Sequence, residues 1–289
     1  MSGTSWWQRL TLSKGPSAGA SDAGKRKASH QGAAKTGRST AKTARSGAAR
    51  PSGGPGRPAR IDPALPVMGV DACKVGWVGA VLDPSGTGTP ILVVSDTIDN
   101  LVSQVGKVTV VGVDIPIGLP DDSRREADVQ TRKFLVGKAS SVFTTPVREA
   151  VYAATYGEAN AINRDKVGAG VSKQAYELRR KIIEVDRYLR QNLDFVLVEV
   201  HPEASLAELT GQPVASRKRT AEGAKERREA LAAAGIYVPT TAPVGVATDD
   251  MIDACAAAWT AHRVKLGVAS RFPAQPETFS DGIDAAIHH

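Results

Sequence analysis

The stretch VTVVGVDIPIGLP, residues 108–120, joins a strongly apolar run to a carboxylate. Its β-branched residues favour extended backbone, and a strand that is apolar on both faces is typical of the centre of a sheet. The run reaches Asp114 and breaks at Pro116, which cannot donate a backbone hydrogen bond. The stretch VMGVD, residues 67–71, ends in the same way on Asp71. Two buried strands that end on acids raise the question of what these carboxylates do there.

The charge of the 289-residue chain is divided unevenly. Residues 1–60 hold 12 Lys and Arg and one acid, Asp22, for a net charge of +11, whereas the remainder holds 25 Lys and Arg against 29 acids, for a net charge of −4. The first segment is rich in Ala, Gly, Ser and Pro and has almost nothing to bury, which predicts a disordered tail. The composition becomes richer in apolar and β-branched residues near residue 66, so we expect one folded domain over residues 66–289.

Two interpretations of the tail stay open. As a basic arm it would add salt-sensitive attraction to nucleic acid. It could also be a solvated tail, or sequence upstream of a true start near residue 67. The composition does not decide between them.

The cysteines and the hydropathy pattern bear on the compartment. Cys73 and Cys255 are far apart and lack CxxC spacing, which excludes a disulfide framework and a structural zinc site. No apolar run is long enough to cross a bilayer, and the first residues lack the apolar core of a secretory signal. We therefore expect a cytoplasmic protein.

The folded part is predicted to contain five strands and several helices. The expected strands cover residues 67–71, 76–83, 90–95, 108–115 and 194–201. The expected helices cover residues 96–106, 121–137, 172–193, 217–235 and 249–267. Three consecutive strands that pair as a meander, followed by two strands reached through helices, predict a mixed five-stranded α/β sheet of order 3-2-1-4-5. With flanking helices and a helical insertion between strands 4 and 5, this is the topology of the RNase H-like fold.

Five acids could meet in such a fold. Asp71 and Asp114 would end neighbouring parallel strands, at the sheet edge where open α/β sheets bind ligands. Glu199 on the fifth strand would join and assist them if its side chain leaves the same face. Asp250 and Asp253 are three residues apart, close to one face of the last helix. Because these acids would repel one another, the pattern predicts a site for two divalent cations, Mg²⁺ or Mn²⁺, which prefer hard oxygen ligands.

Each acid alone also has an ordinary structural explanation. Asp71 could begin a turn, Asp114 could cap the turn that follows it, and Glu199 could pair with an arginine. Asp250 lies in the first turn of a helix, where the helix dipole favours acids, but Asp253 lies one turn further along. Taken together, the acids favour a functional site.

Further candidate residues surround the acids. His201 follows the fifth strand and could shuttle a proton, or be a strand-end residue with satisfied hydrogen bonds. Ser141 and Arg148 lie in SSVFTTPVR and could hold a phosphate or a sugar, or belong to a packed loop. Lys218 and Arg124 could contact phosphates or lie on solvated faces.

Six segments, in order, resemble the domain-of-unknown-function 429 family, whose members are described as predicted RNase H-like nucleases. These segments are GVDACKVGWVGAV, GVDIPIGLP, KASSVFTTPVREAV, SKQAYELRRKIIEVDRYLR, VEVHPEASLAELTG and DDMIDACAAAWTA. The resemblance covers most of residues 67–285. It implies a RuvC/RNase H-like fold with acids on the first and fourth strands and on the last helix, similar to RuvC-type resolvases. The implied metal ligands are Asp71, Asp114, Asp250 and Asp253.

The resemblance leaves the function open between three classes. The leading hypothesis is a metal-dependent nuclease acting on DNA or RNA, although Ala72 stands where the family commonly has glycine and its methyl group could crowd a metal or phosphate. The alternative is a non-catalytic RNase H-like module that binds nucleic acid or a small phosphorylated ligand, which the acidic charge of the folded part favours. A small-molecule phosphohydrolase or phosphotransferase is a third class, and the lack of a P-loop or GxGxxG motif counts against it.

Overall fold

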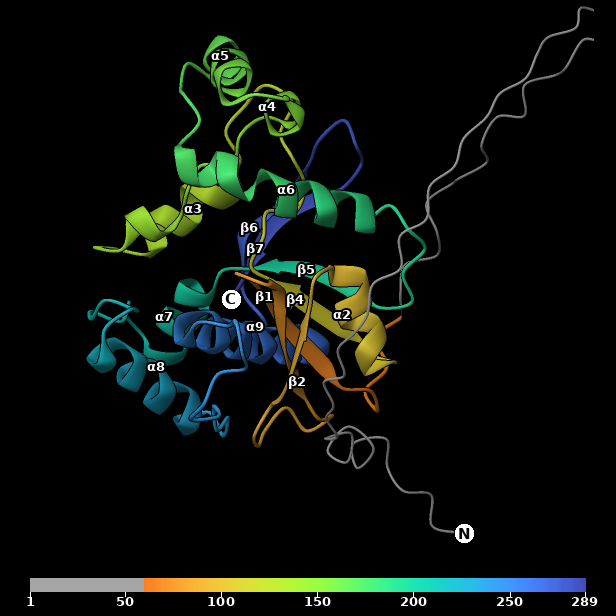
Figure 1. The fold of residues 1–289 in the computed structure, drawn as a ribbon, viewed down its shortest axis with the longest axis vertical. Helices are drawn as coiled ribbons and strands as arrows, with labels where there is room; N and C mark the ends of the chain where they lie inside the picture. Colours follow the sequence, from red (N-terminus) through yellow and green to blue (C-terminus); the bar gives the residue numbers. More distant parts are fainter. Residues whose placement is uncertain (1–59) are drawn as a thin grey trace, which may run out of the picture. The chain divides into compact units, whose positions relative to one another are not determined.

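The computed structural model describes residues 60–289. The predicted N-terminal tail, apart from residue 60, lies outside the described residues. The described part contains one mixed sheet of seven strands in the order β3-β2-β1-β4-β5-β7-β6 (Figure 1). The strands are β1 (Val67–Cys73), β2 (Gly76–Leu82), β3 (Ile91–Ser95), β4 (Val110–Val113), β5 (Val196–Val200), β6 (Arg271–Thr278) and β7 (Asp284–His288).

Helices lie on both faces of this sheet. They are α2 (Ile98–Val105), α3 (Glu126–Phe134), α4 (Arg148–Tyr152), α5 (Tyr156–Val167), α6 (Lys173–Tyr188), α7 (Pro202–Thr210), α8 (Ala221–Ala233) and α9 (Thr248–Leu266), with a 3₁₀ turn, η1 (Ala139–Ser141). Helix α9 covers β1, β2, β4 and β5, and α7 and α8 pack on α9. Helices α2, α3 and α6 lie beyond the opposite face, with α4 and α5 further out (Figure 1). None of the described helices has the length and apolar character needed to cross a bilayer.

The expected mixed α/β sheet flanked by helices is confirmed, and its first five strands follow the expected sequence of neighbours. The prediction of a five-stranded sheet was wrong, because β7 pairs in parallel with β5 and β6 pairs antiparallel with β7. Strand β6 contains Pro273 and Pro276, which cannot donate ladder hydrogen bonds and therefore argue against a strand. The sheet tolerates them because β6 is an edge strand.

The helical insertion between β4 and β5 is present. The sequence analysis did not define its helices α4 and α5, nor helix α7, which follows β5. Helices α4, α5 and α6 bury a small apolar core of their own, which includes Val147 and Ala159. Helix α7 was not predicted, although it begins with Pro202 at its first position and ends at Gly211 in the left-handed conformation. Both residues are helix-boundary signals from which this helix could have been predicted.

Helix α9 lies unusually close to the sheet. A Cβ atom added to Gly69 of β1 would lie 2.0 Å from the backbone nitrogen of Ala258 and 2.1 Å from the backbone oxygen of Ala254. One added to Gly112 of β4 would lie 3.0 Å from the backbone oxygen of Ala257. The backbone of α9 therefore rests directly on two glycines, and the buried alanines of the helix permit this approach.

This contact predicts a large effect of one methyl group. The substitution Gly69→Ala should lower the free energy of unfolding by about 3 kcal/mol or more, because the clash is with helix backbone that no rotamer change relieves. The matched control is Gly157→Ala in α5, where the nearest atom to the added Cβ is 4.0 Å away and which should be neutral or stabilising. Urea unfolding of the two variants measures the difference, and equal stabilities would contradict the packing described.

Candidate metal centre

The ends of β1 and β4 place two carboxylates side by side. Val70 and Val113 are in register on these parallel strands, so Asp71 and Asp114, which follow them, lie at the same edge of the sheet. The backbone nitrogen of Asp114 donates to the carbonyl of Val70 at 2.9 Å, which fixes the two ends together. The prediction that these two acids lie next to each other at the ends of parallel strands is therefore confirmed.

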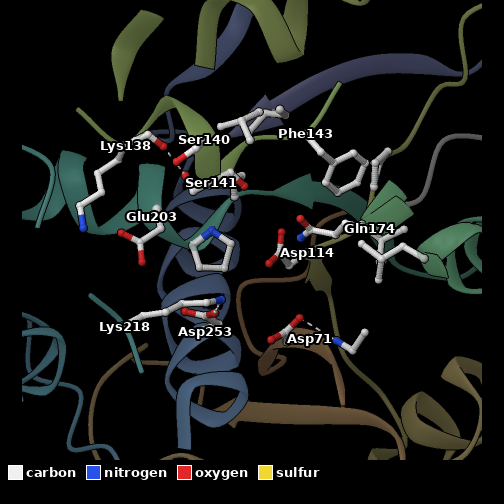
Figure 2. A pocket seen from close by; sticks show the side chains of 18 of the residues that line it. Asp71, Asp114, Lys138, Ser140, Ser141, Phe143, Gln174, Glu203, Lys218 and Asp253 are labelled. Atoms are coloured by element: carbon white, nitrogen blue, oxygen red, sulfur yellow. Dashed lines mark hydrogen bonds and ion pairs between the residues drawn. The ribbon is translucent and has the colours of Figure 1, made fainter. Parts of the chain in front are cut away.

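Helix α9 adds a third carboxylate from the far end of the sequence. Asp253 lies one residue before Ala254, whose carbonyl faces Gly69, so the close packing of the helix brings its side chain to the strand ends. One oxygen each of Asp71, Asp114 and Asp253 lies within 4.8 Å of the other two, and we call this group the acid triad. Figure 2 shows the three side chains gathered at one pocket.

The triad has the properties of a cation site. Asp71 is 8% exposed and Asp253 is 2% exposed, so neither carboxylate is well hydrated. The Oδ1 atom of Asp253 is buried and has no hydrogen-bond partner among residues 60–289. Unsatisfied buried carboxylate oxygens are costly, and three hard oxygen donors match the preference of Mg²⁺ or Mn²⁺. The residues therefore fit a divalent cation.

Burial and mutual repulsion shift the protonation of the triad. Burial raises the pKa of Asp71 well above its usual range, and the charges of Asp114 and Asp253 raise it further. Burial together with the charge of Asp253 raises the pKa of Asp114 to about 7. Burial also raises the pKa of Asp253, against the opposing effect of Lys218. The three groups consequently resist simultaneous ionisation unless positive charge is added.

Lys218 supplies part of that charge. Its Nζ atom lies 2.7 Å from Oδ2 of Asp253. Figure 2 shows the two side chains next to each other. Burial lowers the pKa of the ammonium group, but the attraction of Asp253 and Asp114 outweighs burial and raises it above its ordinary value. Lys218 therefore stays charged and borders the triad.

Asp250, the fourth expected ligand, lies outside the triad. It occupies the first turn of α9, and its Oδ2 accepts a hydrogen bond from the backbone of Ala247 at 3.4 Å. Burial, followed by the charge of Asp249, raises its pKa. Asp250 lines the same cavity as the triad, and because it is half-buried while Asp253 is buried, it lies nearer the rim.

Glu199 does not join the triad, contrary to the expectation. It is in register with Val113, one position before Asp114, so its side chain leaves the other face of the sheet. Both of its oxygens accept from the buried guanidinium of Arg125 at 2.8 Å, and Oε2 also accepts from the backbone of Ile117 at 2.7 Å. Glu199 borders the cavity as a paired structural group, which is the alternative that the sequence left open.

His201 and Ser141 line the cavity, but His201 is held as a helix cap. Its Nδ1 accepts from the backbone of Ala204 at 3.3 Å, and Nε2 lies 3.4 Å from the carbonyl of Ser141. Burial lowers the pKa of the imidazole. A structural role as a helix cap therefore accounts for the contacts of both ring nitrogens.

Arg148 and Arg124 lie away from the acid cavity. The guanidinium of Arg148 forms ion pairs with the buried carboxylates of Asp186 and Asp281. Arg124 lines a separate hollow with Arg132 and Lys133 of α3. The phosphate contacts expected of Arg148 and Arg124 would therefore lie outside the cavity of the triad.

The cavity above the triad has a volume of about 480 Å³ and is also lined by residues outside the set of site residues predicted from the sequence. These residues are Lys138, Phe143, Gln174, Leu178 and Arg217. They come from the insertion and from the segment before α8. Lys138, Phe143, Gln174 and Leu178 lie within segments that resemble the family, but no local pattern assigns them to the site. Only the folded chain brings them over the acids.

Fold and site together define the class: an α/β protein with a buried three-carboxylate centre where two parallel strands end. The chain belongs to the family described as "Protein of unknown function (DUF429)", which matches residues 69–278. The resemblance to that family noted in the sequence is thus confirmed. No curated protein and no solved structure matches the chain. Any statement of function consequently rests on the geometry of the site.

The raised pKa of Asp114 predicts a pH-dependent stability. An acid whose pKa is about 7 when folded and 3.8 when unfolded stabilises the fold while protonated, and this contribution is lost as the pH rises towards 7. In chelator, the free energy of unfolding should therefore fall by about 2 kcal/mol between about pH 5.5 and about pH 7.5 relative to Asp114→Asn. Millimolar Mg²⁺ should restore the loss at the higher pH.

Urea unfolding at the two pH values measures this difference. Taking it between the wild type and Asp114→Asn removes contributions from other groups such as His201, whose lowered pKa acts in the opposite direction. Parallel pH profiles for the two proteins would show that Asp114 is not a strained carboxylate.

Proposed function

We propose that this chain is a metal-dependent nuclease of RNase H-like fold that hydrolyses phosphodiester bonds in nucleic acid. The observation that carries the proposal is the acid triad itself. Asp71, Asp114 and Asp253 come from three separate elements, lie within 4.8 Å of one another through one oxygen each, and include a buried oxygen without a partner in the described part of the chain. A group of carboxylates with this burial favours a bound divalent cation over a purely structural role.

The RNase H-like assignment rests on the placement of the acids in the sheet. The triad takes its members from β1, from the residue after β4 and from the last helix, α9, which is the arrangement that the family resemblance implied. The neighbouring strands β3, β2, β1, β4 and β5 also follow the expected order. The two further strands, β7 and β6, are additions at one edge.

The roles proposed for the side chains follow from their positions. Asp71, Asp114 and Asp253 would hold Mg²⁺ or Mn²⁺, and Asp250 at the rim is the residue available to a second ion. A divalent cation in this place would supply Lewis-acid stabilisation of a phosphoryl oxygen and activation of water. Lys218, which stays charged beside Asp253, would attract and orient the anionic phosphate. Neither Glu199 nor His201 is assigned a proton-transfer step, since both are held by structural hydrogen bonds.

A non-catalytic module that binds nucleic acid or a small phosphorylated ligand is the second candidate. The ion pair between Lys218 and Asp253 favours it, because an ammonium group already neutralises part of the triad. In that case Lys218 is the permanent counterion, and a divalent cation has no place to occupy. The two candidates therefore differ in whether the triad binds metal.

Calorimetric titration with Mn²⁺ separates them. The wild-type chain should bind Mn²⁺, and Asp114→Asn and Asp253→Asn should each weaken binding at least about 10-fold, since each removes a charged ligand. The matched control is Asp165→Asn, which removes a solvent-exposed carboxylate of α5 and should bind like the wild type. Equal affinity in all four proteins would contradict a metal site at the triad.

Cleavage is then tested with labelled single-stranded, duplex, hybrid and branched nucleic acids. The wild type should cut at least one of them in Mn²⁺ and lose the activity in chelator and in Asp114→Asn. Lys218→Gln should bind Mn²⁺ at least as tightly as the wild type, because it removes a competing cation, but should cut more slowly. Tight Mn²⁺ binding without cleavage of any substrate would contradict the nuclease.

A further inference from the structure

The acid triad lies at the bottom of a walled cavity whose two ends differ in chemistry. Figure 2 shows Lys138 and Lys218 on one side of the acids and Phe143 and Gln174 on the other. The cavity volume of about 480 Å³ falls within the range of about 300–1,000 Å³ that is usual for small-molecule sites. The volume and the different linings of the two ends therefore point to a compact ligand with two unlike ends.

The first end offers positive charge that the protein does not neutralise. The Nζ atom of Lys138 donates to the carbonyl of Ser216 at 3.0 Å, and no described carboxylate forms an ion pair with Lys138 or with Arg217. By contrast, Arg227 in the same wall is fully paired with Glu203, with contacts of 2.8 to 3.0 Å. Lys138 and Arg217 are thus cations free to meet an anion.

The second end offers a flat apolar surface and an amide. Phe143 is partly buried against the core of the insertion, so its ring is held in place, and Leu178 lines the same end. Gln174 lies four residues before Leu178 on α6 and presents its amide to the cavity (Figure 2). An aromatic ring beside an amide suits a nucleobase, because the ring stacks on the base while the amide hydrogen-bonds to its edge.

The burial of the acids restricts the form of the nucleic acid. Asp253 is 2% exposed and shares its cavity with Lys138 and Phe143, so a ligand must enter the cavity to approach it. A nucleotide that enters an enclosed pocket together with its base must come from a single strand or be turned out of the stack. Nucleotide units of this kind carry one phosphate and one accessible base.

We infer that the cavity binds one nucleotide unit of a single-stranded or unstacked nucleic acid. Its phosphate lies between the acid triad and Lys138 and Lys218, and its base lies against Phe143. This inference rests on the proposed phosphodiesterase function and specifies the substrate class of that site. It predicts that the base contributes to binding at a defined place in the cavity.

Binding of small probes to the full chain in Mn²⁺ tests the inference by calorimetry. Adenosine and thymidine 5′-monophosphates should bind about 10-fold more tightly than ribose 5-phosphate, the gain expected from stacking one base. Phe143→Leu should abolish this preference and Phe143→Tyr should keep it, since only the second retains a ring. Gln174→Ala, at an exposed position that leaves the fold intact, should reduce it.

The cationic end has its own matched pair. Lys138→Gln should weaken all three phosphorylated probes, whereas Lys225→Gln, on the exposed side of α8, should weaken none. On substrates, an unpaired oligonucleotide should be cut at least about 10-fold faster than the same sequence in a duplex.

The outcomes separate the inference from the proposed function. Equal affinity for ribose 5-phosphate and the nucleotides, or equal cleavage of duplex and single strand, overturns the nucleotide cavity while metal-dependent cleavage stands. Ring-dependent nucleotide binding without Mn²⁺ binding or cleavage supports the cavity and overturns the nuclease.

Discussion

The close approach of α9 to the sheet is the constraint on which the site depends. Gly69 and Gly112 leave no side chain between the helix and strands β1 and β4, and the helix meets them with its own backbone. This direct contact between helix and sheet places Asp253 beside Asp71 and Asp114, the acids at the ends of the strands. A larger residue at either glycine would lift the helix and separate the three carboxylates. The same closeness excludes water, which raises the pKa values of all three acids. One packing contact therefore sets both the geometry and the electrostatics of the centre.

The polar groups around the centre fall into satisfied and unsatisfied sets. The guanidinium of Arg125 binds Glu199 and Asp128 within the described part of the fold, and Arg227 binds Glu203. These pairs fix the segments that form the cavity walls. Arg227 and Glu203 neutralise each other, whereas Arg125 is shared between two carboxylates. Among residues 60–289, Asp253 Oδ1 is the one buried carboxylate oxygen that lacks a hydrogen-bond partner. The unsatisfied carboxylate oxygen thus belongs to the triad, which lines the cavity.

Local patterns in the sequence predicted the part of the site that depends on strand order. The apolar runs that end on Asp71 and Asp114 identify two parallel strands, and parallel pairing is enough to place their acids together. The face of the sheet on which Glu199 lies depends on the register of β5. A slip of one residue would move every side chain of the strand to the other face, and no local sequence pattern determines this register. Strands β6 and β7 escaped prediction because prolines and a short apolar run hide an edge pairing. Lys138 and Phe143 reach the cavity only through tertiary packing of the insertion, which periodicity does not encode.

The most direct test of the metal centre is an anomalous-scattering map from crystals of this protein grown with Mn²⁺. The triad should show one strong peak in contact with oxygens of Asp71, Asp114 and Asp253, with Lys218 displaced from its present contact with Asp253. A map without a peak, in which the Lys218 ammonium still bonds to Asp253, would show that the carboxylates are balanced by the protein alone and that the site is not a metal centre.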